Sequence, residues 1–313
     1  MEFIIYKKNM LKYIFKLEHT TASHISFRIF GIKINCLKTS ILIERKKIAK
    51  FYQSFKNACD IPKATGDLRL VQEAYCGFLK QFDEICHKNN IQYWMDFGTL
   101  IGAIRHKGFI PWDDDIDVSM PRRDYEKFIE KFQNGFENYP DLKIEFENNK
   151  KNKCFIKLKD NNSQNLSLDI FPYDFYYCAL DKEGKKNLSD KIESIRKRNK
   201  KFNTIEEIRE DFANLTKNLI LENKESNCEK PAIFMGIDFP HSHKNKVFDW
   251  EDIFPLQKVQ FENIELSAPN NIESVLKGEF GDFMKIPKDS YPRHSGYNCI
   301  NENERKILEK YSK

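Results

Sequence analysis

The chain has 313 residues, of which 40% are hydrophobic and 32% charged, and its formal net charge is +5. This balance is typical of a globular protein with a sizeable core and excludes a disordered chain. No stretch of about 18 uninterrupted apolar residues occurs, so we expect no membrane-spanning helix. The first residues include Lys7, Lys8 and Lys12 and no small-residue cleavage site, which makes them a poor signal peptide. We therefore expect a cytoplasmic protein.

The eight cysteines agree with that compartment. They show no CxxC motif and no spacing typical of a metal site. We interpret them as small core residues with reduced thiols rather than as metal ligands or disulfides.

Positive charge is concentrated in the first part of the chain. Residues 1–50 contain eleven Lys and Arg against three Glu, a net charge of +8 that leaves −3 for the remainder. The basic residues are interleaved with Phe, Ile and Tyr, so this segment could lie peripherally on the inner face of an anionic cytoplasmic membrane. The alternative is a basic, solvated small domain. The charge is not sustained and no recognised nucleic-acid-binding module occurs, so we expect no nucleic acid partner.

The predicted elements fall into two parts. Residues 25–43 alternate apolar and polar side chains and predict a β-hairpin. Residues 44–62 predict a helix that runs into a linker. We therefore divide the chain into a basic amino-terminal segment, 1–62, and a catalytic domain, 66–300.

The predicted catalytic domain mixes helices and strands. Apolar residues recur at helical spacing over 70–86. The segment "IQYWMDF" (91–97) predicts a strand, and "GTLIGAIRH" (98–106) predicts a short helix with Thr99 as its amino-terminal cap. Strands are predicted at 142–148, 154–160 and 166–180, a helical insertion or second helical layer at 182–225, and then a hairpin and a helix ending near Gly278 or Gly281. This order predicts a mixed α/β or α+β domain.

An acidic stretch carries the strongest chemical signal. "FIPWDDDIDVSMPRRDYEKF" (109–128) places four aspartates within five positions. If these positions form a strand, Asp113, Asp115 and Asp117 share one face, and Asp114 points to the other. Like charges so close together are costly without a cation. Mg²⁺ or Mn²⁺ would resolve the conflict, because carboxylate and phosphate oxygens suit hard divalent ions. The alternative is an acidic loop solvated at the end of a strand.

A further acid lies in "LSLDIFPYD" (166–174). Asp169 is the only charged residue in "LSLDIF", and a lone Asp in a buried strand is costly unless it is paired or bound to a metal. The alternative is an Asp that caps a neighbouring turn. A third acid on an adjacent strand could hold a second metal ion or accept the proton of an attacking hydroxyl. We therefore expect Asp115, Asp117 and Asp169 to be metal ligands and catalytic residues.

Donors for a phosphate are expected near these acids. Gly98 and Thr99 open a helix directly after a strand, so their N–H groups and the positive end of the helix dipole can receive a phosphate. Arg105 and His106 lie at the end of that helix, and each could contact a nucleotide or be solvated. Lys157, in "FIKLKD", is a further candidate for the phosphate. Weaker candidates are His241, His243, Arg293 and His294.

Absent motifs narrow the chemistry further. The chain has no GxGxxG after a strand, no Walker GxxxxGK[ST], no HExxH and no GxSxG. What remains is a Gly-Thr helix start, an Asp-x-Asp strand and a distant acidic strand. This combination indicates metal-dependent phosphoryl or nucleotidyl transfer.

The combination is also the nucleotidyltransferase-fold pattern, and the resemblance extends to a family. "YWMDFGTLIGAIRHKGFIPWDDDIDVSMPRRDYEKF" (93–128) closely resembles the signature of the LicD family, the bacterial phosphocholine transferases related to fukutin and fukutin-related protein. "LDIFPYD" (168–174), "DIFPLQKVQFENIELSAPNN" (252–271) and "LKGEFGDFMKIP" (276–287) are similar to later family segments in the same order. Where the family usually has a Tyr-Gly pair, "EFGD" leaves Phe280 without a hydroxyl.

The resemblance implies an α+β fold, with a nucleotidyltransferase-like mixed sheet flanked by helices. It also implies site roles: Asp115 and Asp117 are the metal pair, Asp169 is the third acid, Gly98-Thr99 is the phosphate-binding turn, and Asp113 is a neighbour that shapes the site.

The implied reaction is transfer of a phospho-alcohol, most often phosphocholine from CDP-choline, to a hydroxyl of a cell-surface glycan. The implied partners are a CDP-linked alcohol donor and a glycan or lipid-linked glycan acceptor of the lipopolysaccharide, capsule or teichoic acid type. Trp94, Trp112 and Tyr173 lie close to the motifs and could hold a quaternary ammonium by cation–π contact, although aromatic residues at such positions are more often core.

Two other functions stay open. A metal-dependent glycosyltransferase also uses Asp-x-Asp to hold a nucleotide diphosphate. A non-catalytic scaffold in glycan assembly is the second alternative, and it would not need an intact set of metal carboxylates.

Overall fold

The computed structural model describes residues 15–20, 24–29, 32–37, 39–149, 153–196, 204–221, 229–237, 246–291 and 300–313. The chain forms two compact units, and the division falls between Lys56 and Asn57. The smaller unit also includes Ile286–Tyr291.

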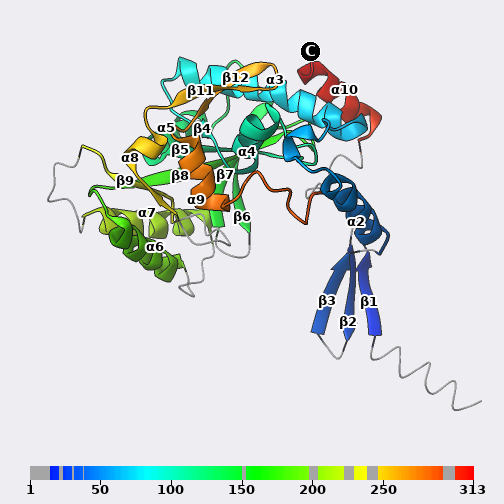
Figure 1. The fold of residues 1–313 in the computed structure, drawn as a ribbon, viewed down its shortest axis with the longest axis horizontal. Helices are drawn as coiled ribbons and strands as arrows, with labels where there is room; N and C mark the ends of the chain where they lie inside the picture. Colours follow the sequence, from blue (N-terminus) through cyan, green and yellow to red (C-terminus); the bar gives the residue numbers. More distant parts are fainter. Residues whose placement is uncertain are drawn as a thin grey trace, which may run out of the picture. The chain divides into compact units, whose positions relative to one another are not determined.

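The smaller unit contains an antiparallel sheet of β1 (Phe15–Thr20), β2 (His24–Ile29) and β3 (Ile32–Leu37), followed by α2 (Thr39–Gln53) (Figure 1). The predicted hairpin corresponds to β2 and β3, and β1 adds a third strand. The helix begins at Thr39, although the alternation predicted a strand as far as residue 43. Short apolar runs such as "ILI" (41–43) fit either element, so periodicity alone does not place this boundary.

The larger unit is built on a seven-stranded mixed sheet. The described strand order is β10-β9-β8-β5-β4, with β7 also paired to β8, and β6 paired to β7. β5 and β8 run parallel, whereas β7 and β9 pair antiparallel with β8. The bounds are β4 (Trp94–Met95), β5 (Ile116–Pro121), β6 (Leu142–Asn149), β7 (Lys153–Asp160), β8 (Ser167–Tyr176), β9 (Ala232–Met235) and β10 (Val247–Phe248).

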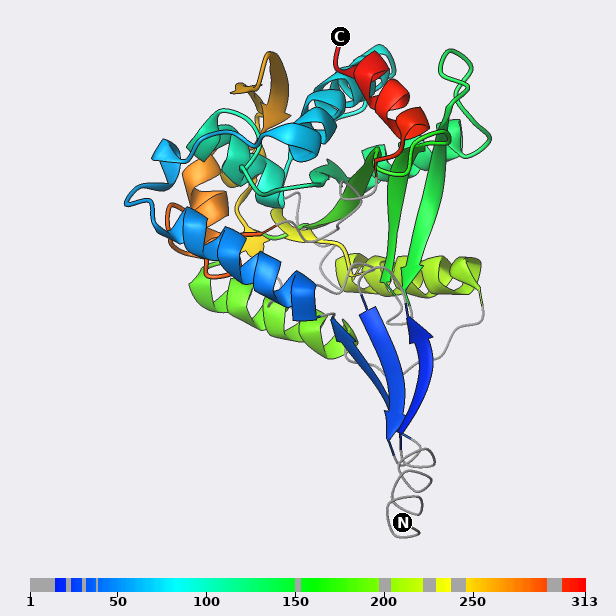
Figure 2. The same cartoon turned by 90° about the vertical axis from the view of Figure 1, so that its right-hand side faces the viewer.

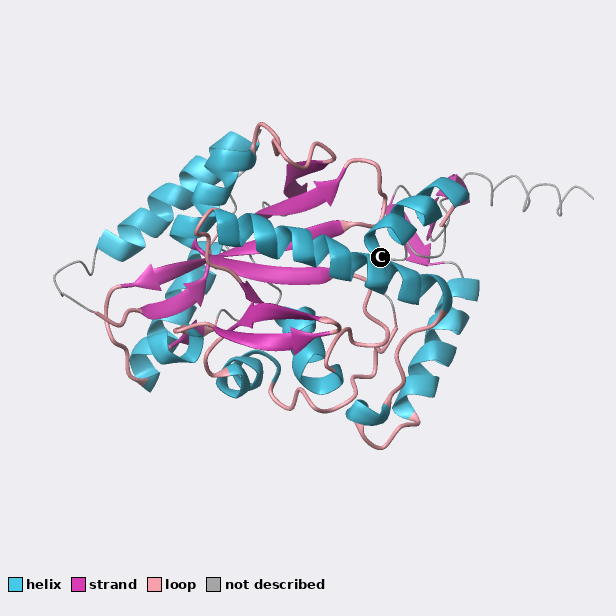
Figure 3. Cartoon of the chain, turned by 90° about the horizontal axis from the view of Figure 1, so that it is seen from above, coloured by secondary structure: helices cyan, strands magenta, loops and turns pink. Residues whose placement is uncertain are grey.

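Helices cover the sheet on both sides. Figures 1 and 2 show α3 and α10 along one side of the larger unit and α6 and α7 along the opposite side. Figure 3 looks from the side of α3 and α10 onto the strands beneath. The bounds are α3 (Gly66–Lys88), α4 (Phe97–His106), α5 (Arg122–Phe132), α6 (Lys182–Arg196), α7 (Ile205–Leu221), α8 (Trp250–Ile253), α9 (Ile272–Phe280) and α10 (Glu302–Tyr311). The expected fold, a mixed sheet flanked by helices, is confirmed.

Apolar periodicity explains why these helices pack where they do. α3 buries the face predicted for it, including Tyr75, Phe78 and Phe82. The helices predicted within 182–225 are α6 and α7, which share a core with β9 through residues such as Ile192, Ile208 and Phe234. In the described part of the chain, no helix is both long enough and apolar enough to cross a bilayer.

A separate two-stranded hairpin, β11 (Gln257–Phe261) and β12 (Ile264–Ala268), precedes α9. α9 ends at Gly281, whose φ of 68° lies in the left-handed region that favours glycine. Both the hairpin and this helix end agree with the sequence prediction.

Candidate active site

Three charged side chains lie in one row across the central strands. Asp117 on β5 is the register partner of Asp169 on β8, and Asp169 is in turn the partner of Lys157 on β7. The ammonium group of Lys157 lies 2.8 Å from Oδ1 of Asp169 and 3.1 Å from Oδ2. The structure therefore brings two of the predicted acids together and places the predicted cation on one of them.

The other aspartates of the acidic stretch precede the strand. β5 begins at Ile116, so the alternation predicted for Asp113, Asp115 and Asp117 applies only to the last of them. The prediction that Asp114 points away is wrong, because Asp113, Asp114 and Asp115 each offer a carboxylate oxygen and these oxygens lie within 4.8 Å of one another.

The late start of β5 has a local cause. A turn at 111–112 is closed by a hydrogen bond from the N–H of Asp113 to the carbonyl of Ile110, at 2.9 Å. Pairing with β8 begins only at Ile116, opposite Leu168. The three preceding aspartates are therefore presented from a loop, which lets consecutive carboxylates converge as a strand would not.

Negative charge accumulates in this site. Burial raises the pKa of Asp117 well above its usual value, and the charges of Asp115, Asp169 and Asp113 raise it further. For Lys157, burial lowers the pKa, but the neighbouring Asp169 outweighs this effect, so the pKa is raised overall. A single described ammonium group thus faces several carboxylates. This oxygen-rich, net negative set fits a hard divalent cation such as Mg²⁺.

The start of α4 is tied to the strand that carries Asp117. The hydroxyl of Thr99 accepts a hydrogen bond from the N–H of Asp117 at 2.9 Å. A Cβ atom at Gly98 would lie 2.7 Å from Oδ2 of Asp113, so any larger residue would push that carboxylate away. The N–H groups of Gly98 and Thr99 belong to the first turn, where a helix offers no internal acceptor. They are therefore placed beside the acidic loop.

The helix cap differs from the prediction. Asp96, not Thr99, is the amino-terminal cap, and its Oδ1 accepts from the N–H of Phe97 at 2.9 Å. Its Oδ2 accepts from the hydroxyl of Ser119 at 2.6 Å. Phe97 has a φ of 44°, an uncommon conformation for a bulky residue. The buried Asp96 therefore holds a strained helix start against β5.

Arg105 and His106 are engaged inside the protein. Arg105 is buried and donates from Nε to His106 at 2.9 Å and from Nη1 to the carbonyl of Phe283 at 2.8 Å. Its guanidinium lies 5.6 Å from the ring centre of Trp112. Burial and the neighbouring Arg105 lower the pKa of His106 to about 3, so the imidazole is neutral and can accept from Arg105. Contact of either residue with a nucleotide stays a prediction.

The aromatic residues near the motifs belong to the core. Trp94, Trp112 and Tyr173 are all buried, and the rings of Trp94 and Tyr173 lie 5.1 Å apart, edge to face. This placement agrees with the alternative interpretation of these residues as core rather than as a cage for an ammonium group.

One face of α3 holds both halves of the site, and the sequence analysis missed it. Gln72 donates to the carbonyl of Asp113 at 2.9 Å, and Tyr75 donates to the carbonyl of Asn165, just before β8, at 2.5 Å. On the same helix, three residues before Gln72, Arg69 forms two hydrogen bonds with Glu262, at 3.0 Å each. The available signal was polar residues at helical spacing on a mostly apolar face.

Glu262 extends this support to the loop before the acidic stretch. Its carboxylate accepts from the N–H of Phe109 at 3.3 Å, and its own N–H donates to the carbonyl of Lys107 at 2.8 Å. A Cβ atom at Gly108 would lie 2.3 Å from Glu262. The β11–β12 turn is thus fitted against the segment that leads to the aspartates.

A buried network links α9 to the cap of α4. The hydroxyl of Tyr173 donates to Oε1 of Glu279 at 3.2 Å, and the charge of the buried Asp96 acts on both groups. Burial, followed by the charge of Asp96, raises the pKa of Glu279 well above its usual value. The other acid of β8, Asp174, accepts two hydrogen bonds from Arg122, at 2.8 and 2.9 Å.

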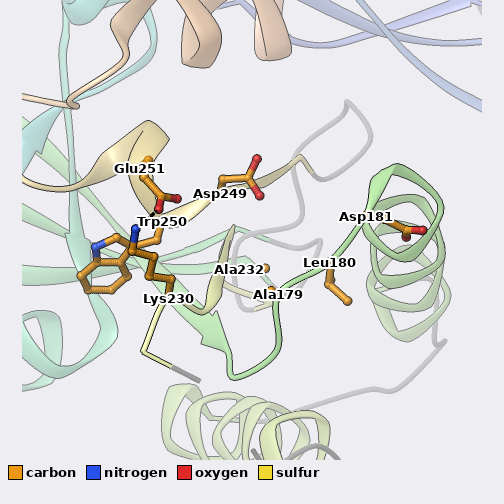
Figure 4. Close-up of a pocket in the computed structure, with 8 residues that line it drawn as sticks. All are labelled: Ala179, Leu180, Asp181, Lys230, Ala232, Asp249, Trp250 and Glu251. Atoms are coloured by element: carbon orange, nitrogen blue, oxygen red, sulfur yellow. Dashed lines mark ion pairs between the residues drawn. The ribbon is translucent and has the colours of Figure 1, made fainter. Parts of the chain in front are cut away.

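A pocket of about 400 Å³ lies elsewhere in the larger unit (Figure 4). Asp181 accepts from the N–H of Gly184 at 2.7 Å, and Asp249 caps α8. Lys230 pairs with Glu251 at 2.5 Å, and Figure 4 shows the ring of Trp250 turned away from the other lining residues. The polar groups that line this pocket therefore cap helices or form ion pairs. None of the lining residues belongs to the acidic site.

The weaker candidates, His241, His243, Arg293 and His294, lie outside the described residues. The main candidates, from Gly98 to Asp169, all lie within them.

The fold and the site define the class as a nucleotidyltransferase-type domain. A mixed sheet presents paired aspartates on adjacent strands, directly beside a Gly-Thr helix start. A family profile described as the LicD/FKTN/FKRP nucleotidyltransferase domain matches residues 90–204, which include the main candidates but not the weaker ones.

Relatives extend the match along the chain. The lipopolysaccharide cholinephosphotransferase LicD of Haemophilus influenzae is 29% identical over 258 residues, covering 72% of this chain and 96% of that protein. An uncharacterized protein of Rickettsia typhi is 35% identical over 109 residues, 32% of this chain and 34% of that protein. One of Rickettsia prowazekii is 50% identical over 46 residues, 15% of this chain and 17% of that protein. Residues 90–204 are thus similar to the LicD/FKTN/FKRP nucleotidyltransferase domain, and a longer part of the chain is similar to a LicD protein.

Proposed function

We propose that this protein transfers phosphocholine from CDP-choline to a hydroxyl of a cell-surface glycan and releases CMP. The observation that carries the proposal is the pairing of Asp117 with Asp169 on parallel strands, beside the start of α4, in a domain similar to that of the LicD family. The name of the Haemophilus influenzae relative, a lipopolysaccharide cholinephosphotransferase, supports the choice of substrate class.

The residues proposed to hold Mg²⁺, or Mn²⁺, are Asp115, Asp117 and Asp169. Bound there, the ion would neutralise charge on the diphosphate of the donor and on the departing CMP. The raised pKa of Asp117 supports this assignment, because crowded carboxylates favour a bound cation.

The chain's own groups would orient the donor. The N–H groups of Gly98 and Thr99 point out of the first turn of α4, where they and the helix dipole favour a phosphate. Asp113 lies against Gly98 and limits how closely a side chain or ligand can approach that turn. Lys157 would hold Asp169 in its ionised form and add positive charge beside the phosphates.

The bond changes balance without a further reactant. The acceptor oxygen forms a bond to the phosphorus of phosphocholine, and the bond between that phosphorus and the CMP oxygen breaks. The proton of the acceptor hydroxyl needs a base, and Asp169, the carboxylate paired with Lys157 in the row of charged residues, is the proposed acceptor. CMP leaves with the electron pair of the broken bond.

We also propose that the reaction takes place in the cytoplasm. Among the described cysteines, Cys59, Cys76, Cys86 and Cys178 are free thiols, which supports a reducing compartment.

The test is a thermal-shift screen with Mg²⁺ and a set of donors: CDP-choline, CDP-ethanolamine, CDP-ribitol, CDP-glycerol and nucleotide sugars. We expect CDP-choline to raise the melting temperature most, and Asp117→Asn to remove the Mg²⁺-dependent part of that rise. Stabilisation by a nucleotide sugar and by none of the CDP-alcohols would instead indicate a glycosyltransferase.

A further inference from the structure

α2 of the smaller unit has an inner face that is anchored within that unit. The guanidinium of Arg45 lies 5.0 Å from the ring centre of Tyr291, and Gln53 donates to the carbonyl of Lys288 at 2.8 Å. Ala49, midway between them, is buried. These positions recur every four residues, so they define one side of the helix.

The outer face of α2 combines large apolar side chains with lysines. Ile43 and Phe51 are 50% and 54% exposed, which makes them the most exposed large hydrophobic residues that the structure describes. Lys46, Lys47 and Lys50 are exposed as well. Helical geometry places Ile43, Lys47, Lys50 and Phe51 on the side away from Ala49, and Lys46 at the edge of that side.

The charge of this helix is one-sided. Its 15 residues contain Arg45, three lysines and a single acid, Glu44, within an amino-terminal region whose net charge over residues 1–50 is +8. Lysines can lay their aliphatic stems along an apolar surface while the ammonium groups reach anionic groups. Bulky apolar residues flanked by lysines are the features of helices that lie in a membrane interface.

We propose that the outer face of α2 docks on an anionic phospholipid surface. Ile43 and Phe51 enter the headgroup region, and Lys46, Lys47 and Lys50 contact lipid phosphates. A second copy of the chain is a poorer occupant, because a symmetric contact would place the same lysines opposite one another. The inference goes beyond the proposed reaction and does not depend on it.

The test is co-sedimentation of the full chain with vesicles of phosphatidylcholine alone or mixed with phosphatidylglycerol. We expect binding only to the mixed vesicles, weakened by high salt because the attraction is electrostatic. The triple variant Lys46→Glu, Lys47→Glu, Lys50→Glu should bind at least about a hundredfold more weakly, since each basic residue near such a surface contributes about a fivefold factor. Phe51→Ser should lower the affinity for the mixed vesicles about tenfold.

The matched control reverses three exposed lysines of the larger unit, Lys80→Glu, Lys131→Glu and Lys310→Glu. It has the same net charge as the test variant and should keep most of the binding. Equal loss in both triple variants would show attraction by overall charge and overturn the proposal. So would failure of the wild type to bind, or a concentration-dependent dimer that Phe51→Ser converts to monomer. Donor-induced thermal shifts, measured without vesicles, should be unchanged in both triple variants, which separates this inference from the proposed reaction.

Discussion

The ammonium group of Lys157 lies 2.8 Å from the carboxylate of Asp169, on the far side of β8 from Asp117. Asp169 therefore faces another acid on one side and its counter-ion on the other. Burial, followed by the charges of Asp115 and Asp169, raises the pKa of Asp117. Lys157 therefore offsets part of the repulsion between the acids on the adjacent strands. Removal of the Lys157 ammonium group should change both the stability of the protein and its affinity for a metal ion.

Lys157→Met is expected to lower the free energy of unfolding of the metal-free protein by about 1 kcal/mol, since a partly buried carboxylate loses its partner. Mg²⁺ should then raise the melting temperature more in the variant than in the wild type, because the ion replaces the lost positive charge. Lys159→Met is the matched control, as Lys159 lies on the same strand and pairs with the exposed Glu145. Equal Mg²⁺ responses in wild type and Lys157→Met would contradict this assignment.

Asp117→Asn should separate stability from function. Burial and neighbouring carboxylates make the charged form of Asp117 unfavourable, so the neutral amide should stabilise the metal-free protein by about 1 kcal/mol at neutral pH. The same change should abolish the Mg²⁺-dependent rise in melting temperature and the transfer activity.

Asp174→Asn is the contrasting variant. Asp174 lies on the same strand as Asp169, but both of its oxygens are bound by Arg122. Breaking this buried pair should cost about 3 kcal/mol of stability and leave the Mg²⁺ response in place.

A metal-free Asp117→Asn protein that is less stable than the wild type would argue against a carboxylate cluster held together by a cation.

The sequence identified residues that the structure brings together, but it did not predict how they are arranged. Residue types and spacing were enough to select Asp117, Asp169 and the Gly98-Thr99 turn, because each breaks a local rule: charge in an apolar strand, or glycine at a helix start. The partner of Asp169 could not be found this way. Lys157 meets it only because β7 pairs with β8 in one register, which is a tertiary fact.

The acidic loop shows the second limit of prediction from sequence. The aspartates 113–115 and "IDV" form one continuous pattern in sequence, yet pairing with β8 begins at Ile116. The preceding residues are held instead by Gln72, from a helix about 40 positions earlier, through the carbonyl of Asp113. Local propensity contains no information about such contacts, so strand alternation was extended too far and Asp114 was assigned to the wrong side.

Asp96 predicts a pH dependence of stability. Burial raises the pKa of Asp96 to about 6, against the opposing effect of its hydrogen bonds. Because an unfolded Asp has a pKa of about 3.9, the folded protein holds this proton more tightly. The resulting stability is fully present below about pH 4 and is lost as the pH rises through about 6, a change on the order of 3 kcal/mol.

The measurement compares urea unfolding of the wild type and Asp96→Asn between pH 4 and pH 7. Asn can keep the cap bond to Phe97 and does not titrate in this range. As the pH rises through about 6, the free energy of unfolding of Asp96→Asn should increase relative to that of the wild type. Parallel stability curves for the two proteins would show that Asp96 does not carry the proton.

Glu279 is expected to hold its proton more tightly in the folded protein than in the unfolded chain. The hydroxyl of Tyr173 lies 3.2 Å from Oε1 of Glu279, and the buried Oε2 has no hydrogen-bond partner among the described residues, which is unfavourable for a carboxylate. Burial favours the same assignment, because it raises the pKa of Glu279 well above its usual value.

Glu279→Gln tests this assignment, because the amide has the shape and the donor of the protonated acid. We expect its free energy of unfolding at pH 7 to stay within about 0.5 kcal/mol of the wild type, whereas Glu279→Ala should lose about 1–3 kcal/mol with the buried hydrogen bond. Tyr173→Phe should lower the free energy of unfolding by a similar amount, since it leaves Glu279 without the hydroxyl that contacts its Oε1. If Glu279→Gln were as unstable as Glu279→Ala, the native group would be the carboxylate.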